Sequence, residues 1–136
     1  ATSNSDTAKT FQEIPGITVF KNWKDLIESD CCDAVIITLP HLLHHEPAMY
    51  ALEHGKHVLC EKPLAPTAEQ AKEMFTVAEE NHVYLMEAFA YQHSPYLTAI
   101  REEIEQGVIG DIRYMESAYI TSDYNKENIR YGSCRK

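Results

Sequence analysis

The sequence predicts an α/β protein in which short parallel strands alternate with helices. Residues 34–39 form a continuous apolar run that Pro40 ends, which is typical of a strand buried on both faces of a parallel sheet. Segments with helical spacing separate this run from shorter apolar runs at 57–60 and 83–86. Strands and helices that alternate with short connections form right-handed βαβ units, so we expect a doubly wound sheet.

Two helices and one strand are predicted ahead of the long apolar run. Ser5 or Asp6 is placed to cap a helix that runs through Glu13. Residues 17–20 are rich in β-branched side chains, which favours a strand. Asn22 can cap a second helix, whose apolar residues recur at helical spacing: Trp23, Leu26 and Ile27.

Three further helices follow the same logic. Residues 46–54 have helical spacing and end at Gly55, a natural left-handed terminator. Thr67 is followed three residues later by a glutamine, which is a capping-box pattern at the start of a helix. Residues 95–106 form the last predicted helix.

The pattern changes after Gly110. Residues 111–121 alternate and are long enough to be a strand in a sheet of a different kind. We therefore expect residues 1–109 to form a partial first domain, and residues 110–136 to begin a second, α+β domain.

Composition and charge exclude several classes of partner. Twelve Lys and Arg against 21 Asp and Glu give the 136-residue chain a formal net charge of −9, which repels nucleic acid and anionic membrane surfaces. No apolar run approaches the roughly 20 residues that span a bilayer. The four cysteines form no CxxC motif, and we expect a reducing, cytoplasmic compartment.

Polar and ring-bearing residues gather where three predicted strands end, at 40–45, 61–63 and 87–95. Ligands of a doubly wound sheet bind beyond the carboxyl ends of its strands, so these segments are expected to form one site. Lys62 follows a buried strand directly and precedes a proline, which restricts its backbone. Its amine could polarise a substrate oxygen or give it a proton. The alternative is a surface lysine paired with Glu61.

Other polar residues in these segments allow competing interpretations. His41, His44, His45 and Glu46 suggest a metal, but adjacent histidines on a helix diverge by about 100° and no further ligand is nearby, so no metal is expected. Glu87 could act as an acid or base. Tyr91 and Tyr96 could donate a proton, although tyrosines more often serve as core-edge residues.

Four motifs in order resemble the Gfo/Idh/MocA family of NAD(P)-dependent oxidoreductases, over residues 1–130. They are Leu39-Pro40 with His44 following, Gly55-Lys56-His57-Val58, Glu61-Lys62-Pro63 and Met86-Glu87-Ala88-Phe89. The last motif is most similar to the branch of dihydrodiol dehydrogenase and D-xylose dehydrogenase.

The resemblance implies a Rossmann domain followed by an open, mainly antiparallel sheet used for dimer contact. It also implies hydride transfer between NADP, or alternatively NAD, and a hydroxyl-bearing carbon of a sugar, polyol or trans-dihydrodiol. Lys62 falls on the lysine that this family places near the nicotinamide and the reacting oxygen. The cofactor-binding residues that the resemblance implies are Ser3, Asn4, Leu39, Pro40, His41, His44, Glu61, Lys62, Pro63 and Gln92.

Several departures from the family pattern affect the cofactor. Asn4 stands where an arginine favours NADP, so it can hydrogen-bond a 2′-phosphate but brings no charge. Gln92 replaces another arginine. None of the five glycines forms the GxGxxG turn that binds pyrophosphate. We therefore expect an internal fragment that is inactive alone and shows no saturable NADPH binding.

A different class of function is a non-catalytic binding or regulatory module on a truncated reductase fold. The missing phosphate turn and the alternating segment at 111–121 favour it. The DNA that flanks the coding sequence discriminates the two, because an in-frame strand with GxGxxG upstream and a glycine-rich, Asp-containing segment downstream would favour the enzyme.

Overall fold

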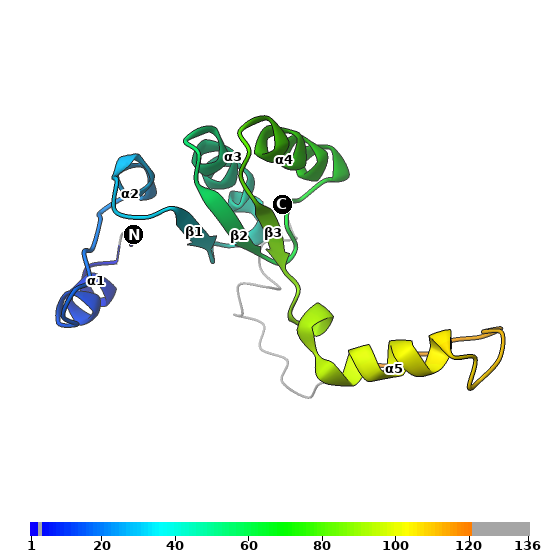
Figure 1. The fold of residues 1–136 in the computed structure, drawn as a ribbon. Helices are drawn as coiled ribbons and strands as arrows, with labels where there is room; N and C mark the ends of the chain where they lie inside the picture. Colours follow the sequence, from blue (N-terminus) through cyan, green and yellow to red (C-terminus); the bar gives the residue numbers. More distant parts are fainter. Residues whose placement is uncertain (3, 121–136) are drawn as a thin grey trace. The chain divides into compact units, whose positions relative to one another are not determined.

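The computed structural model describes residues 1–2 and 4–120. The chain divides into two compact units, residues 1–94 and residues 95–136. Figure 1 labels the helices and strands along the chain. Because the division follows Ser94, helix α5 (Pro95–Glu105) belongs to the second unit, although the sequence boundary near Gly110 assigns it to the first domain. The division into domains at residue 110 stays a prediction.

A three-stranded parallel sheet forms the centre of the first unit. Strands β1 (Ala34–Ile37), β2 (His57–Glu61) and β3 (Leu85–Ala88) lie in that order, with β2 in the middle. Both strand pairs are parallel, and the helices between them supply the crossovers. The predicted α/β class with a parallel sheet is confirmed.

Helix α1 (Ser5–Gln12) begins one residue earlier than the sequence indicates. The side chain of Asn4 is its cap, because Oδ1 accepts the N–H groups of Asp6 and Thr7 at 2.9 and 3.0 Å. The prediction of a cap at Ser5 or Asp6 is therefore wrong. Asn4 has the extended backbone that a cap requires, with φ −82° and ψ 118°.

Two later caps are confirmed. Asn22 Oδ1 accepts the N–H three residues on at 2.9 Å and starts α2 (Trp23–Glu28). Thr67 Oγ1 accepts the N–H three residues on at 3.3 Å and starts α4 (Ala68–Glu80). Each cap satisfies a donor at the helix start that has no partner within the helix.

Helices α3 (His45–Glu53) and α4 cover one face of the sheet (Figure 1). Helix α3 ends just before Gly55, which adopts the left-handed φ of 71° that the sequence predicts. The core lies between these helices and the strands. Its buried side chains include Ala48, Ala51, Leu52, Met74 and Ala78 from the helices and Val35, Ile37, Val58 and Cys60 from the strands.

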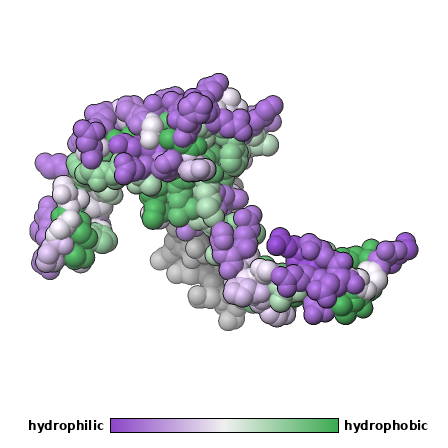
Figure 2. Space-filling model, in the orientation of Figure 1, coloured by the Kyte–Doolittle hydropathy of each residue, from purple (hydrophilic) through white to green (hydrophobic). Residues whose placement is uncertain are grey.

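The other face of the sheet is open, so the prediction of a strand buried on both faces is wrong. Burial alternates along β1, where Val35 and Ile37 are buried and Ile36 is 70% exposed. Ile36 pairs in register with Leu59, and Leu59 with Met86, so these three side chains share the open face. Among the described residues, helix packing covers only the opposite face. Figure 2 shows hydrophobic surface beneath the hydrophilic layer of the helices.

Two predicted strands do not form in the described part of the chain. Residues 17–20 have no strand partner and make a single backbone bond to the N-terminal segment, from Thr2 N–H to Phe20 C=O at 3.2 Å. Residue 111 lies in a bend, residues 112–120 have no regular secondary structure, and residue 121 lies outside the described residues. A strand needs a neighbouring strand to pair its backbone N–H and C=O groups, and neither segment has such a partner among the described residues.

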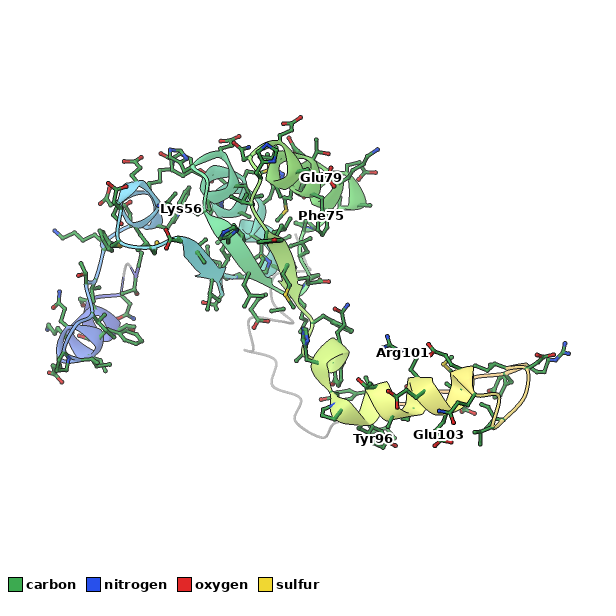
Figure 3. The ribbon with its side chains drawn as sticks, in the orientation of Figure 1. Lys56, Phe75, Glu79, Tyr96, Arg101 and Glu103 are labelled. Carbon is green, nitrogen blue, oxygen red and sulfur yellow. The ribbon has the colours of Figure 1, made fainter. Side chains whose placement is uncertain are left out.

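The second unit contains helix α5, whose end is marked by Gly107 with φ 75°. None of its residues is buried, and Tyr96, Arg101 and Glu103 project from it (Figure 3). No helix within residues 1–2 and 4–120 has the length and apolar character needed to cross a membrane.

Candidate active site

Hydrogen bonds join the loops that follow β1 and β2 to each other and to the carboxyl end of β3. The loop after β1 contributes the carbonyl of Leu39, and the loop after β2 contributes the peptide between Pro63 and Leu64. Strand β3 contributes the carboxylate of Glu87. The convergence that the sequence predicts from parallel topology is therefore present in the structure.

His44 lies at the centre of this network. It ends the short 3₁₀ turn His41–Leu43, precedes α3 and is only 1% exposed. Its Nε2 is 2.7 Å from the carbonyl oxygen of Leu39, and its Nδ1 is 2.9 Å from the carbonyl oxygen of Pro63. One imidazole ring thus connects the loops that follow β1 and β2.

Glu87 holds the other end of the same peptide. The N–H of Leu64 donates to Glu87 Oε1 at 2.8 Å, while the Pro63 carbonyl faces His44. The Pro63–Leu64 peptide is therefore fixed at its oxygen and at its nitrogen. The sequence considered Glu87 only as an acid or base, and it did not single out Leu64. Strand register could have identified the role of Glu87. Glu87 lies opposite Cys60 on the neighbouring strand, and Cys60 is two residues before Lys62.

The buried side chain of Cys60 contacts the turn that contains Leu64. Its Sγ lies 3.8 Å from the carbonyl oxygen of Leu64, and its side chain is fully buried. Burial, and to a smaller extent the nearby carboxylates of Glu61 and Glu87, raise the pKa of the Cys60 thiol to about 11. Cys60 therefore remains a thiol that donates to the carbonyl of Leu64.

Lys62 is exposed at the end of β2, directly before the fixed peptide. The Lys62–Pro63 bond is cis. Within residues 1–2 and 4–120, no ion pair links Lys62 to Glu61, so the alternative of a paired surface lysine does not form. An exposed ammonium beside a fixed backbone can reach the oxygen of a bound substrate.

The other predicted site residues take no part in the hydrogen bonds between His44, the Pro63–Leu64 peptide and Glu87. Pro40 begins the turn, since its carbonyl accepts the N–H of Leu43 at 2.8 Å, and His41 is half-buried. The oxygen of Asn4 is used by the α1 cap. Gln92 is exposed in the 3₁₀ turn Ala90–His93. Ser3 lies outside the described residues.

Among the described residues, no hydrogen bond joins Asn4 or Gln92 to the hydrogen-bonded residues around Lys62. Their roles in cofactor binding stay predictions.

The histidines of the first loop do not converge on one point. Both ring nitrogens of His44 face carbonyl oxygens, and His45 Nε2 lies 2.9 Å from Glu73 Oε2 on α4. The described part of the chain has no group of three or more His, Cys, Asp or Glu side chains placed to hold a metal ion.

Two hollows lie near the N-terminal segment. One, of about 350 Å³, is lined by Thr2 and Lys21 and by residues 35–39 that lead into the first loop. The other, of about 530 Å³, is lined by the apolar residues Ala8, Val19 and Phe20 and by polar or cationic residues that include Asn4, Ser5, Lys9 and Lys21. Sequence reasoning identified Asn4 here but neither lysine.

A parallel sheet with helical crossovers and polar loops at the carboxyl ends of its strands is an α/β fold of the Rossmann-like class. Residues 1–89 match the family model described as "Oxidoreductase family, NAD-binding Rossmann fold", the Gfo/Idh/MocA family. The chain belongs to this family, as the resemblance in the sequence predicts.

Curated relatives include sugar-nucleotide and diol enzymes. The chain is 39% identical over 126 residues to dTDP-3,4-didehydro-2,6-dideoxy-alpha-D-glucose 3-reductase of Actinomadura kijaniata, covering 93% of this chain and 38% of that protein. It is 31% identical over 125 residues to trans-1,2-dihydrobenzene-1,2-diol dehydrogenase of Xenopus laevis, covering 91% and 38%. The chain thus spans well under half the length of these relatives.

A solved structure has the same fold. The open conformation of KijD10, a 3-ketoreductase from Actinomadura kijaniata in complex with TDP-benzene and NADP, matches with a TM-score of 0.74 and 41% identity. The match covers 82% of this chain and 35% of that chain. The Rossmann-like arrangement of the sheet and its helices is confirmed by this comparison.

Proposed function

We propose that this chain carries the catalytic lysine of an NAD(P)-dependent oxidoreductase that acts on a hydroxyl-bearing carbon of a sugar, polyol or trans-dihydrodiol. The observation that supports this most is the placement of Lys62. Its ammonium is exposed at the carboxyl edge of a parallel sheet, beside a peptide that Glu87 holds at the nitrogen and His44 faces at the oxygen. The relatives named above are oxidoreductases that act on sugars or diols.

Lys62 acts on the oxygen of the reacting carbon. When bound, the nicotinamide exchanges a hydride with that carbon. The Lys62 ammonium donates a hydrogen bond to the oxygen, which stabilises the negative charge that develops there during reduction of a carbonyl. The same amine can pass the proton that the oxygen gains in reduction or loses in oxidation.

Two lysines that line the hollow near the N-terminus favour NADP over NAD. The missing arginine beside Asn4 removes one charge from the expected 2′-phosphate site, but Lys9 and Lys21 line the same hollow of about 530 Å³. The Lys9 ammonium is exposed, and its Nζ lies as far as 4.0 Å from Asp6 Oδ1. An exposed ion pair at this distance is weak, so Asp6 does not occupy the Lys9 ammonium. The residues present therefore fit a phosphate group.

The test uses the product of the complete reading frame that encodes residues 1–136. Sugars, polyols and trans-diols are scanned for a change in NADPH absorbance, and Lys62→Ala is compared with Lys72→Ala. Lys72 is an exposed lysine on α4, so it matches the lost charge without lying at the strand ends. We expect Lys62→Ala to lose about 100-fold or more of the turnover. Equal turnover in both variants removes Lys62 from the mechanism.

The proposal also includes a cytoplasmic location and assembly as a dimer. The free thiols of Cys31 and Cys32 suit the reducing cytoplasm that the sequence indicates. Assembly as a dimer through a C-terminal sheet rests on the family resemblance. Sedimentation of the complete product tests it, and a monomer at working concentrations contradicts it.

A further inference from the structure

The ring of His44 has a carbonyl oxygen at hydrogen-bond distance from each nitrogen. The distances are 2.7 Å from Nε2 to Leu39 O and 2.9 Å from Nδ1 to Pro63 O. A carbonyl oxygen only accepts, and a neutral imidazole has one donor nitrogen and one acceptor nitrogen. In the neutral ring, one of these contacts would set a nitrogen lone pair against an oxygen lone pair inside the protein.

We propose that His44 is an imidazolium that donates to both carbonyls and thereby positions Lys62 for catalysis. The catalytic part of this inference rests on the proposed function, whereas the protonation of the ring does not. With both N–H groups in place, His44 cross-links the loops after β1 and β2. His44 is a positioning residue, because it acts on the reaction through the turn that presents Lys62.

The charge of the buried ring is balanced through the peptide it holds. The Pro63 carbonyl accepts from His44, and the N–H of the same peptide donates to the Glu87 carboxylate at 2.8 Å. A cation at the oxygen end and an anion at the nitrogen end polarise the peptide in the same direction, so each hydrogen bond strengthens the other. This arrangement offsets the cost of burying an ionised group, which is high for an isolated charge.

Other ionisable groups on the surrounding elements do not contact the His44 ring among the described residues. His45 is engaged with Glu73 on α4 at 2.9 Å. The other ionisable groups on these elements are His41 on the preceding turn and Glu87 on β3. Helix α3 carries Glu46, Tyr50 and Glu53, and β2 and its end carry His57, Cys60, Glu61 and Lys62. The helices packed on α3 carry Lys24, Asp25 and Glu28 on α2, and Glu69, Lys72, Glu79 and Glu80 on α4. Of these, only Glu87 is connected to the ring, through the shared peptide.

The fixed peptide restrains Lys62 through proline. The proline ring sets φ of Pro63, and His44 and Glu87 fix the orientation of the following peptide. Few torsions therefore remain free between the clamp and the backbone of Lys62. A displacement of about 1 Å at a reacting group can cost about 100-fold in rate, so loss of the clamp lowers turnover even when Lys62 is present.

The first experiment measures the ring directly in the chain of residues 1–136. Histidine is labelled with ¹⁵N, and two-bond nitrogen–proton correlation spectra are recorded on the folded chain. We expect both ring nitrogens of His44 at the chemical shifts of protonated nitrogens, with two N–H protons protected from solvent exchange. One nitrogen at the shift of an unprotonated nitrogen overturns the proposal. No substitution is needed, so the result does not depend on whether a variant folds.

The second experiment measures turnover in the product of the complete reading frame. His44→Gln removes the double donor, and Glu87→Gln keeps an acceptor for Leu64 N–H but removes the charge. We expect both to lower kcat about tenfold or more while KM for the substrate changes less than about threefold. His54→Gln, at the C-terminal end of α3 and outside the strand-end segments, is the control and should leave kcat unchanged.

The outcomes separate this inference from the proposed function. Wild-type kcat in His44→Gln and Glu87→Gln, together with a large loss in Lys62→Ala, overturns the positioning role while leaving the oxidoreductase intact. A wild-type protein that reduces no sugar, polyol or diol contradicts the proposed function, and the nitrogen spectra still decide the protonation of His44.

Discussion

The two faces of the sheet in the first unit differ in how far their side chains are buried. On the covered face, Val35 and Ile37 are buried in the same cluster as Leu52 of α3 and Met74 of α4, which are both fully buried. On the open face, Ile36 is 70% exposed and Met86 is 41% exposed, although the side chains are as apolar as those opposite. Helix packing, rather than the composition of the strands, therefore decides which face stabilises the fold. The loops of the candidate site emerge at the edge where both faces end.

The largest stability effect is expected on the covered face. Leu52→Ala removes a fully buried side chain from α3 and leaves a cavity between the helix and the strands. The free energy of unfolding should fall by about 2–5 kcal/mol, as measured by urea denaturation of the chain. A loss below about 1 kcal/mol would show that the covered face is not a packed core.

Cys60, also on the covered face, should make stability fall in alkaline solution. Its pKa is raised from 9.0 to about 11, so below pH 9.0 both the folded and the unfolded chain hold the thiol proton. Between these values only the folded chain keeps it, and the free energy of unfolding decreases with a slope of at most about 1.4 kcal/mol per pH unit.

Unfolding midpoints across this pH range test the effect of Cys60. Cys60→Ala is the matched variant, since it removes the thiol and leaves every other titrating group. Its stability should depend less steeply on pH than that of the wild type. Parallel curves for the two chains would contradict the assignment.

The cap of α4 should contribute a smaller amount. Thr67→Ala leaves an unpaired N–H at the start of the helix that covers the sheet, and we expect a loss of about 1 kcal/mol in thermal or urea unfolding. Thr76→Ala, in the middle of the same helix, is the control. Equal effects at both positions would mean that the cap is not what Thr67 contributes.

The smallest effect is expected on the open face. Ile36→Thr keeps a β-branched side chain in β1 and removes apolar surface that is already exposed to water. Unfolding free energy should change by no more than about 0.5 kcal/mol. A loss comparable to that of Leu52→Ala would show that something covers this face in solution.

Much of the fold could be predicted because it depends on local patterns. The caps at Asn22 and Thr67 and the glycine terminator at Gly55 are set by residues within one helical turn. The strands at 17–20 and 111–121 were predicted from the same kind of pattern and do not form within the described residues. Strand formation depends on a neighbouring strand, which a local pattern does not report.

The candidate site was predictable in outline but not in its contacts. Parallel topology placed the three loops at one edge, which required only the order of strands and helices. The hydrogen bonds that fix the turn join residues 19 apart, His44 and Pro63, and 23 apart, Leu64 and Glu87. Such bonds depend on side-chain geometry in the folded chain, so the sequence treated His44 as a cofactor contact and Glu87 as an acid or base.

Chemical rescue of Lys62→Ala tests the central claim most directly. The variant is made in the product of the complete reading frame, and kcat is measured with increasing concentrations of a small primary ammonium such as methylammonium. Because the lost group is an exposed amine at the end of β2, the account predicts a large drop in kcat and partial recovery that saturates with the added amine. A Lys62→Ala protein that turns over substrate at the wild-type rate without added amine would contradict it.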